Sequence, residues 1–520
     1  MKAKKIKGTL LLAFAATICS AQILFTGNVQ IANMSQARGI AACSDGGFGV
    51  VGDVYTSLSS SVFLTKLSAS GVQQWSTNIS KGGTQFYIWK AAVISLADSG
   101  FLVSTIQITT DSLYIFRVNK SGVVQWCKNV SYAAEACMIQ SSDGGFLIVG
   151  TESFSPYNRI IIHKLDYSGT SQWDNYYQAS GGFLAKPCIA FQNVNGDYTI
   201  SSDCNYGAQK QIRIMRIQSN GTLIWANRYY MPLATQVLTT YKMKEQAGGN
   251  LNILFEAQTM GLKSKLAKLI LTSAGAVTGN QDNHFLADTG MHASAALFTP
   301  DGGFAFAGYK LQNSPADSWV LKFDSLENLE WAELFPVAAT HEFANQLVQN
   351  SSALAYSAWQ FGAGTTTAQV SKISFSGQSA CTNVPFSLTD SAYGIITTND
   401  TIVTGTYMNS YSAPYSLLSG TTASISCTSG IEPGETEEND FTIGPGPAGS
   451  FLFIYPGKLN NGEMVFEIYD MRGRLVMNTG VIKANNADRI MMNISPLAGG
   501  IYVLSAKSKN GIVSRKFLKE

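Results

Sequence analysis

The sequence predicts an all-β protein, a β-propeller followed by a small C-terminal β-sandwich. Two features of residues 22–427 favour the propeller: a unit of about 50 residues recurs, and each unit holds four short apolar segments separated by turns. A third feature is the change after residue 427, where an acidic stretch leads into a different strand pattern. With 13% charged residues and 48 glycines in 520 residues, the composition fits a folded extracellular all-β chain.

Residues 1–21 predict a secretory signal peptide. Four lysines within the first seven residues precede the apolar run "TLLLAFAATICS", and the small residues Ser20 and Ala21 mark the cleavage point. A lipoprotein signal centred on Cys19 is the alternative. Removing the peptide changes the formal net charge from +2 to −2, which favours no nucleic-acid partner. No other apolar run approaches the roughly 20 residues of a membrane-spanning helix.

The repeat is clearest in five segments that each contain a β-rich run, a polar turn and a tryptophan. These are "SVFLTKLSASGVQQW" (61–75), "SLYIFRVNKSGVVQW" (112–126), "RIIIHKLDYSGTSQW" (159–173), "QIRIMRIQSNGTLIW" (211–225) and "DSWVLKFDSLENLEW" (317–331). Degenerate copies occupy 263–279 and 368–381. The equivalent turn positions, 47 to 54 residues apart, are Gly71, Gly122, Gly169, Gly221, Gly275, Glu327 and Gly377.

A weaker eighth unit spans residues 400–420. We therefore expect eight blades, with seven as the alternative, and a β-helix or open solenoid is the competing architecture. The opening segment 22–29 is suited to complete the last blade and close the ring.

Three units contain an Asp-Gly-Gly turn, at Asp45, Asp143 and Asp301. Asp-Gly and Gly-Gly supply positive φ and a local side-chain hydrogen bond, so we interpret these aspartates as structural turn residues. Other units keep turn residues without keeping the aspartate in register: "ADSGF" (97–101), "NGDY" (195–198) and "GGNL" (248–251). Calcium binding, the alternative interpretation, would require the carboxylate itself.

One tryptophan recurs in each of five units: Trp75, Trp126, Trp173, Trp225 and Trp331. We interpret these side chains as blade-to-blade packing, because a ligand-binding aromatic is rarely needed in every repeat. The segment "KLDYSGTSQW" resembles the eight-bladed propellers of the pyrroloquinoline-quinone dehydrogenase type. That resemblance implies blade construction alone, since the adjacent Cys-Cys pair of those quinoproteins is missing; we expect no cofactor.

A basic residue lies five positions before the turn position in six units: Lys66, Arg117, Lys164, Arg216, Lys322 and Lys372. If the ring closes, these side chains occupy equivalent positions and form a cationic ring that suits an anionic glycan or lipid head group. The alternative is an edge charge that is solvated or stacked on tryptophan.

No catalytic constellation is recognisable, so no catalytic or metal-binding residue is predicted. The four histidines lack the H-E-x-x-H spacing, and there is no G-x-S-x-G elbow, P-loop or EF-hand loop. The seven cysteines outside the signal peptide lack a C-x-x-C spacing. Pairing of Cys188 with Cys204 and of Cys381 with Cys427, or free buried thiols, are the alternatives.

The C-terminal part divides into an acidic Pro/Gly linker, residues 428–450, and a basic module, residues 451–520. The module resembles the type A sorting domain of the Bacteroidetes type IX secretion system. The matching residues are Tyr455-Pro456, then Tyr469, Asp470, Gly473 and Arg474 in "EIYDMRGRLV" (467–476), and Gly500, Ile501, Tyr502 and Lys516 in "ISPLAGGIYVLSAKSKNGIVSRKFLKE" (494–520). Gly457 and Lys458 depart from the family's Asn-Pro, and the spacing to the second segment is short.

The resemblance implies export through the periplasm and then across the outer membrane by the type IX machinery, to the cell surface or outside. There the sorting domain is commonly removed. Our leading hypothesis is a monomeric, non-catalytic module that binds a glycan or a surface protein. The alternatives are a carbohydrate-active hydrolase or lyase with its site in the propeller cleft, and a structural or adhesion protein.

Overall fold

The computed structural model of the chain describes residues 24–519 apart from the following segments: 31–34, 56–59, 81–90, 108–111, 131–133, 153–158, 180–182, 207–208, 231–236, 259–263, 279–282, 287–289, 312–314, 337–339, 363–364, 381–382, 387, 391–395, 400–401, 407–409, 413–415, 419–421, 430–441, 445–450, 456–460, 471–474, 486–489 and 509–510. The chain divides into two compact units, residues 1–429 and 430–520. The expected signal peptide, Cys381 and most of the expected linker lie outside the described residues.

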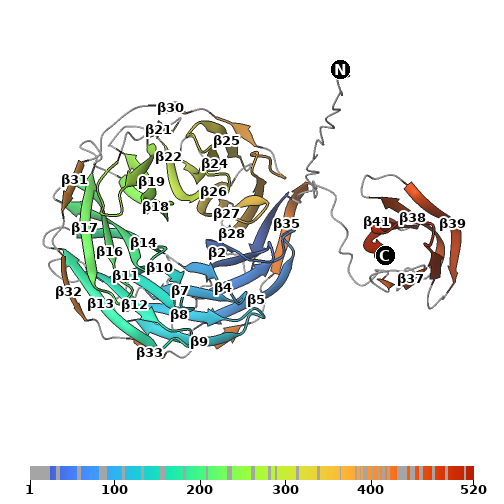
Figure 1. Cartoon of the computed structure of the whole chain (residues 1–520), viewed down its shortest axis with the longest axis horizontal. Helices are drawn as coiled ribbons and strands as arrows, with labels where there is room; N and C mark the ends of the chain where they lie inside the picture. Colours follow the sequence, from blue (N-terminus) through green and yellow to red (C-terminus); the bar gives the residue numbers. More distant parts are fainter. Residues whose placement is uncertain are drawn as a thin grey trace, which may run out of the picture. The chain divides into compact units, whose positions relative to one another are not determined.

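The first unit contains seven five-stranded antiparallel sheets among the described residues, arranged around a ring (Figure 1). Blades 1 to 3 have their four inner strands at β2 (Ser35–Ala42), β3 (Phe48–Tyr55), β4 (Ser60–Leu67) and β5 (Gln73–Ser80); β6 (Ala92–Ser95), β7 (Phe101–Gln107), β8 (Ser112–Val118) and β9 (Val124–Val130); and β10 (Ala134–Gln140), β11 (Phe146–Glu152), β12 (Arg159–Leu165) and β13 (Ser171–Ala179).

Blades 4 to 6 follow in the same order along the chain. Their inner strands are β14 (Phe183–Gln192), β15 (Tyr198–Tyr206), β16 (Gln209–Ile217) and β17 (Leu223–Tyr230); β18 (Val237–Glu245), β19 (Leu251–Gln258), β20 (Lys265–Leu271) and β21 (Asn283–Phe285); and β22 (Met291–Phe298), β23 (Phe304–Lys310), β24 (Asp317–Phe323) and β25 (Leu329–Phe335). The all-β propeller prediction is confirmed.

Blade 7 joins both ends of the propeller sequence. It combines β26 (His341–Gln349), β27 (Ala353–Gly362) and β28 (Thr365–Ser374) with the N-terminal strand β1 (Leu24–Gln30). Strand β1 pairs with β28 on one side, for example Phe25 with Lys372, and with a C-terminal strand on the other. The opening segment therefore completes the last blade, since its backbone pairs on both sides with strands of that sheet.

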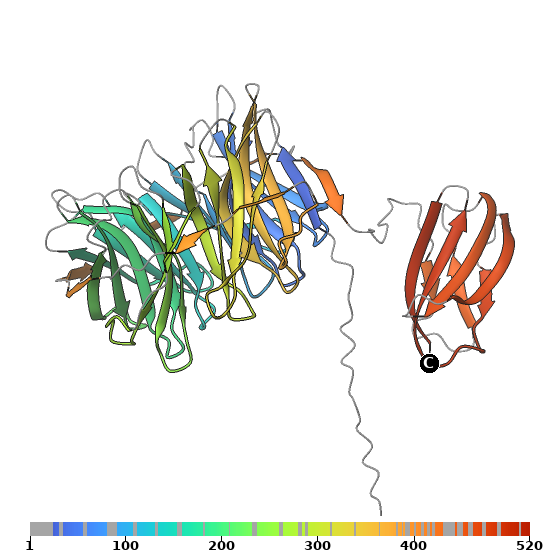
Figure 2. The ribbon, with the colours of Figure 1, turned by 90° about the horizontal axis from the view of Figure 1, so that it is seen from above.

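A chain segment that we call the belt, residues 384–429, supplies the fifth, outermost strand of every blade. It passes around the ring in reverse order of the blades, from blade 6 to blade 1 and finally to blade 7 (Figures 1 and 2, orange). Its strands are β29 (Val384–Pro385), β30 (Thr389–Asp390), β31 (Ile396–Asn399), β32 (Ile402–Thr406), β33 (Ser410–Ser412), β34 (Ser416–Leu418) and β35 (Thr422–Ser429).

The belt corrects the expected blade number from eight to the alternative of seven. Residues 400–420, which we expected to form an eighth blade, instead add single short strands to blades 3, 2 and 1. A blade needs four strands that pair with one another, whereas these strands pair with the exposed edges of complete blades. Residues 400–420 therefore supply edge strands to three blades and do not form a blade of their own.

The hydrophobic core lies between neighbouring blades. Every residue of β7 and β8 is buried, as expected for strands that are covered on both faces. One cluster combines Val51 and Leu64 of blade 1 with Val103 and Phe116 of blade 2, and equivalent clusters follow around the ring. Each blade is thus stabilised mainly by burial against its neighbours.

The second unit is a small β-sandwich, as predicted. One sheet has the order β36 (Thr442–Gly444), β37 (Phe451–Tyr455) and β40 (Ile490–Asn493); the other has the order β39 (Leu475–Asn485), β38 (Asn461–Asp470), β41 (Gly500–Ser508) and β42 (Gly511–Lys519). Leu452, Phe466 and Leu504 share one core cluster between the sheets. Strand β36 shows that the sandwich includes residues before the expected boundary at 451. In the described part of the chain no helix is long and apolar enough to cross a membrane.

Candidate ligand-binding mouth of the propeller

The aspartates of the Asp-Gly-Gly turns pair with the basic residues of the expected cationic ring. In blade 1, Lys66 Nζ lies 2.9 Å from Asp45 Oδ2 and donates to the carbonyl of Leu67 at 2.9 Å. In blade 3, Lys164 Nζ lies 2.7 Å from Asp143 Oδ2. Two features that lie 21 residues apart in the sequence therefore form one ion pair in each of these blades.

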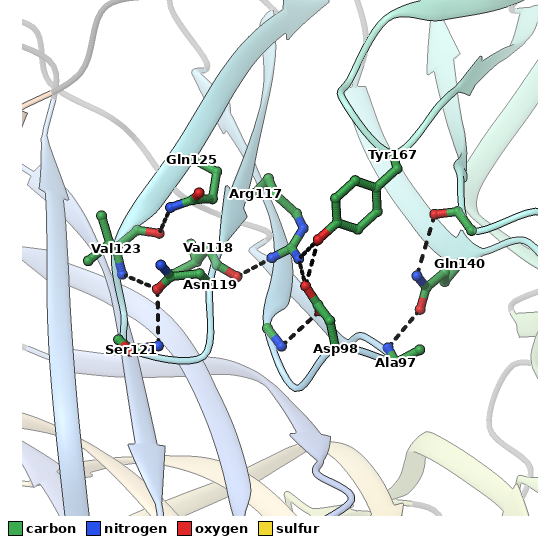
Figure 3. A network of polar contacts seen from close by, with 12 residues as sticks. Ala97, Asp98, Arg117, Val118, Asn119, Ser121, Val123, Gln125, Gln140 and Tyr167 are labelled. Carbon is green, nitrogen blue, oxygen red and sulfur yellow. Dashed lines mark hydrogen bonds and ion pairs between the residues drawn. The ribbon is translucent and has the colours of Figure 1, made fainter.

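The same arrangement extends to turns in which the sequence analysis did not place the aspartate in register. Asp98 of "ADSGF" pairs with Arg117, and Tyr167 of blade 3 donates to the same carboxylate at 2.7 Å (Figure 3). In blade 4, Arg216 contacts Asp197 at 3.2 Å. The expectation that "ADSGF" lacks an equivalent aspartate was wrong, because Ser99 replaces the first glycine and adopts a φ of 65°.

In blade 6 the contacts of the turn lower the pKa of the aspartate. Lys322 Nζ lies 2.6 Å from Asp301 Oδ2. Burial acts to raise the pKa of Asp301, but hydrogen bonds from Lys322, Thr299 and the Gly303 backbone outweigh it and hold the pKa at about 2. The carboxylate is therefore ionised at neutral pH, and it accepts its hydrogen bonds from groups of the turn and from Lys322.

Each of the six basic side chains is buried, and the structure places each beside acceptors of its own or the next blade. Lys372 of blade 7 donates to the carbonyl of Ala69 in blade 1 at 2.9 Å. A cationic ligand ring stays a prediction, yet the ion pairs already neutralise the charges at five of the six positions: Lys66, Arg117, Lys164, Arg216 and Lys322.

The repeated tryptophans lie between neighbouring blades, on the same face as these turns. The indole N–H of Trp75 donates to Lys120 O of the next blade at 2.9 Å, and Trp173, Trp225 and Trp331 make the equivalent bond to Ser219, Ser273 and Phe375. Trp126 lies against Gly169 of the next blade, where an added Cβ would come within 2.9 Å of the indole. At the ring closure Phe25 takes this place beside Gly71.

At the opposite ends of the strands, blades 6 and 7 form what we call the aromatic shelf: Tyr309, His341, Phe343, Trp359 and Phe361. Phe343 and Trp359 are cross-strand partners whose rings stack at 4.4 Å with an interplanar angle of 17°. His341 is stacked 6.2 Å from Phe343, and Tyr309 of blade 6 contacts Phe343 edge-on at 5.3 Å. The shelf therefore spans the junction of two blades, and Phe361 at its end is 46% exposed.

A polar cluster continues the shelf toward blade 5. His292, the cross-strand partner of Tyr309, has its ring 6.0 Å from that ring. Its Nδ1 lies 3.7 Å from Oε1 of Glu256, and the hydroxyl of Tyr241 donates to Glu256 Oε2 at 2.8 Å. Glu256 is 1% exposed, and its Oε1 has no hydrogen-bond partner among the described residues.

β-bulges in the innermost strands determine how these side chains are directed. The register shifts at Tyr241, Ser294 and Asn345, the bulge residues of blades 5, 6 and 7. Each contacts the carbonyl that precedes the bulge of the next blade: Ser294 donates to Ala344 O at 2.6 Å, Asn345 donates to Ala37 O at 2.6 Å, and Tyr241 Oη lies 2.7 Å from Ala293 O. The bulge residues thus link the innermost strands of neighbouring blades next to the polar cluster.

The sequence analysis missed every residue of the shelf and of the polar cluster. Their sequence signal is weak, because the shelf residues alternate with buried residues in ordinary strands and lie in three different segments. The available signal was the density of aromatic residues and histidine at the starts of two first strands, "MHAS" and "HEFAN". In the part of the chain that the structure describes, no group of His, Cys, Asp or Glu is placed to hold a metal ion.

Cys43 and Cys137 are free thiols. Cys204 is buried, and the side chain of Cys188 lies outside the described residues, so the Cys188–Cys204 pairing stays one of the two alternatives. Burial raises the pKa of Cys137 to about 12, which disfavours the nucleophilic thiolate.

In the second unit, the Gly-Ile-Tyr segment of the sorting-domain resemblance begins the central strand β41. Tyr502 is buried, its ring stacks 5.8 Å from Phe517, and its hydroxyl donates to Ala498 O at 2.9 Å. The hydroxyl of Tyr469 donates to Glu467. Gly473, Arg474 and Pro456 lie outside the described residues.

Fold and site together define a β-propeller protein with a C-terminal β-sandwich. Residues 442–520 match the secretion system C-terminal sorting domain. The protein is therefore a type IX secretion substrate, exported to the cell surface or outside.

Solved structures similar to this chain include polysaccharide lyase Uly1, with 11% identity over 66% of this chain and 91% of that chain and a TM-score of 0.42. Sqt1 from Chaetomium thermophilum shows 11% identity over 65% and 86% of the two chains, with a TM-score of 0.35. The WD40 domain of SCAP from fission yeast shows 12% identity over 68% and 93%, with a TM-score of 0.33. Among curated proteins no sequence matches this chain.

Proposed function

We propose that this secreted or cell-surface propeller binds a saccharide on the aromatic shelf without chemistry of its own. The observation that carries the proposal is the Phe343–Trp359 stack, which Tyr309 extends across the blade 6–7 junction. Aromatic faces pack against the apolar C–H faces of sugar rings, and hydroxyl, imidazole and amide groups beside them fix orientation. The shelf lies on the face opposite the tight turns, where the side chains are not used in repeated ion pairs.

Partial exposure supports a binding role for these rings over a purely structural one. Phe343, Trp359, Tyr309 and His341 are all half-buried, whereas the aromatic residues that fill the blade cores, such as Phe306, are fully buried. Leaving large rings partly in water forgoes stabilisation of roughly 25 cal/mol per Å² of apolar surface. A row of such rings on one rim is typical of an interaction site.

The test is glycan binding by the full exported chain, measured on a glycan array and quantified by calorimetry. We expect Trp359→Ala and Phe343→Ala each to weaken binding at least about tenfold, which corresponds to 1.4 kcal/mol. Phe451→Ala is the matched control, because Phe451 is an exposed aromatic residue of the separate C-terminal unit. Unchanged binding in both shelf variants, with melting temperatures equal to wild type, would contradict the proposal.

A carbohydrate-active enzyme is the second candidate function, and the Glu256–His292 contact favours it. A carboxylate beside an imidazole at the edge of a saccharide site is suited to proton transfer. Incubating the chain with each glycan that it binds and following products by mass spectrometry separates the two functions. Turnover that Glu256→Gln abolishes would replace binding alone with catalysis.

A further inference from the structure

We infer that a hollow beside Glu333 is a binding site for a primary ammonium group. The hollow has a volume of about 330 Å³ and is lined by Leu24, Glu333, Gly377 and Asn383, among others. Gly377 belongs to the tight turn that follows β28, so the hollow lies on the face opposite the aromatic shelf. The inference therefore stands apart from the proposed saccharide binding. We call this cavity the Glu333 hollow.

In three blades, the side chain two residues after the repeated tryptophan donates to the tight turn of the next blade. The pairs are Thr77 with Gly122 O, Asn175 with Gly221 O and Asn227 with Gly275 O. In blades 3 and 4, a tyrosine two residues further along the same strand donates to the same carbonyl. The repeat thus provides each of these carbonyls with a donor from the preceding blade.

Blade 6 departs from this pattern at both positions. Glu333 stands where blades 3 and 4 have asparagine, and Phe335 stands where they have tyrosine. An ionised carboxylate and a phenyl ring have no proton to donate. Gly377 O instead accepts from Asn383 at 3.4 Å, which is long for a hydrogen bond. At this turn two acceptors, the Glu333 carboxylate and Gly377 O, therefore replace the usual donor and acceptor.

The carboxylate of Glu333 lacks a compensating charge. Its Oε2 is buried and has no hydrogen-bond partner in the part of the chain that the structure describes. Burial raises the pKa of Glu333, and a hydrogen bond from Asn383 lowers it in part. A buried acceptor without a donor is costly, and a cationic donor compensates a carboxylate best. Because the carboxylate turns readily about its last side-chain bond, either oxygen can face a ligand in the hollow.

A primary ammonium group matches these acceptors. It carries three N–H donors on one compact positive charge, enough for Glu333 and for neutral acceptors such as Gly377 O. A calcium ion would require roughly six to eight oxygen ligands. Among the described residues no group of His, Cys, Asp or Glu could hold a metal ion. At roughly 30 Å³ per water molecule, the hollow also has room for a short alkyl stem against Leu24.

The ammonium group has two conceivable sources with the same chemistry. One is this chain itself: the expected signal cleavage after Ala21 creates an α-amino group on Gln22, two residues before Leu24 in the sequence. Two extended residues span up to about 7 Å. The other source is a separate alkyl amine that enters from solution. The experiment has one arm for each source.

The first arm measures protection of the chain's own α-amino group. The exported full chain, its first residue identified by mass spectrometry, is acylated with an N-hydroxysuccinimide ester. An ammonium group held by a carboxylate is less often in the reactive neutral form. If the chain supplies the ammonium group, the α-amino group should react at least about tenfold more slowly in wild type than in Glu333→Gln.

The second arm measures binding of an added amine by saturation-transfer NMR. Butylammonium is compared with butanol, which lacks the charge, and with butyltrimethylammonium, which has the charge but no N–H donor. A chain whose α-amino group is blocked, by acetylation or by cyclisation of Gln22, should bind butylammonium at least about tenfold more tightly than either analogue. Binding by the unblocked chain as well identifies a separate amine as the occupant; binding by the blocked chain alone identifies the chain's own terminus.

Two further variants complete the design. Glu333→Asn restores the residue of blades 3 and 4, so it should remove the amine site and raise the melting temperature by donating to Gly377 O. Glu330→Gln is the matched control, because Glu330 lies on the same strand, pairs with Lys322 and does not line the hollow. It should leave both arms unchanged.

The inference is wrong if removing the Glu333 carboxylate changes neither measurement. That outcome would be equal α-amino labelling in wild type and Glu333→Gln, together with butylammonium binding that is absent or equal in the two blocked chains. Butyltrimethylammonium binding as tight as that of butylammonium would also contradict it, since the site would then recognise charge without N–H donors. Each of these results leaves saccharide binding on the aromatic shelf untouched.

Discussion

Lys164 and Asp143 face each other across a turn of blade 3, with Nζ 2.7 Å from Oδ2, and they differ sharply in burial. The lysine side chain is 3% exposed and the aspartate side chain is 50% exposed. The ammonium group also donates to Leu165 O at 3.3 Å, so it is held inside the blade by oxygen atoms of two neighbouring strand ends. The pair recurs around the ring and supports the same turn in each blade.

This asymmetry predicts unequal costs for removing the two partners. Asp143→Ala leaves a buried ammonium without its counter-charge and should cost about 1–3 kcal/mol of unfolding free energy. Lys164→Met keeps the aliphatic stem and leaves a half-exposed aspartate that water can solvate, so it should cost less than about 1 kcal/mol. Urea unfolding followed by circular dichroism measures both. A larger loss in Lys164→Met than in Asp143→Ala would contradict this account.

The two glycines of the same turn should respond differently to substitution. Gly144 has a φ of 82° and an added Cβ would meet nothing within 4 Å, so Gly144→Asn should be nearly neutral. An added Cβ on Gly145 would lie 2.3 Å from Leu165 O and 2.7 Å from Lys164 Nζ. Gly145→Ala should therefore cost about 1–3 kcal/mol through overpacking. Melting temperatures of the two variants test this, and equal losses would contradict it.

Strand β35 should protect the closure of the ring. It pairs with β1 from Leu24–Ser429 to Gln30–Thr422, so β1 becomes an exposed edge when β35 is missing. A chain that ends at residue 421 should show much faster amide exchange in β1 than a chain that ends at residue 429. Both lack the sorting domain, which makes the longer chain the matched control. Equal protection of β1 in the two chains would show that β28 alone holds it.

Glu342 should make blade 7 less stable as the pH rises. Its carboxylate accepts from Tyr356 at 3.0 Å, and burial raises its pKa from 4.5 to about 7. Because the folded pKa is higher than the unfolded one, stability is fully present below about pH 4.5 and is lost as the pH rises to about 7. At about 1.4 kcal/mol per pKa unit the loss is at most about 3–4 kcal/mol.

The variant Glu342→Gln should remove this slope and raise the melting temperature at about pH 8 relative to wild type. Gln keeps the side-chain volume and an acceptor for Tyr356 without a charge. Differential scanning calorimetry between about pH 5 and pH 8 measures the slope. A wild-type slope of opposite sign, or an unchanged slope in the variant, would contradict the assignment to Glu342.

How far the sequence could predict this protein depends on the range of the interactions involved. The repeated turns and the strand pattern of each blade were readable because they depend on neighbours in the chain, as in Asp143, Gly144 and Gly145. The C-terminal sandwich was readable for the same reason, from alternating strands and the Gly-Ile-Tyr segment. The ion pairs were predicted only in part. Asp143 and Lys164 were each recognised as repeated positions, but their contact was not predicted, and Lys164 was assigned to a ligand ring.

By itself, the sequence determined an exported all-β chain of repeated four-stranded units with a C-terminal sorting domain, because local turn chemistry and strand periodicity require no distant partner. The tertiary structure alone decided the number of blades. Strands as short as β29 and β30 show no strand periodicity in the sequence, and they are recognised only by their pairing with the edge of a blade. It also decided the shelf: Tyr309, Phe343 and Trp359 come from three strands of two blades, and only packing of blade 7 against blade 6 brings their rings together.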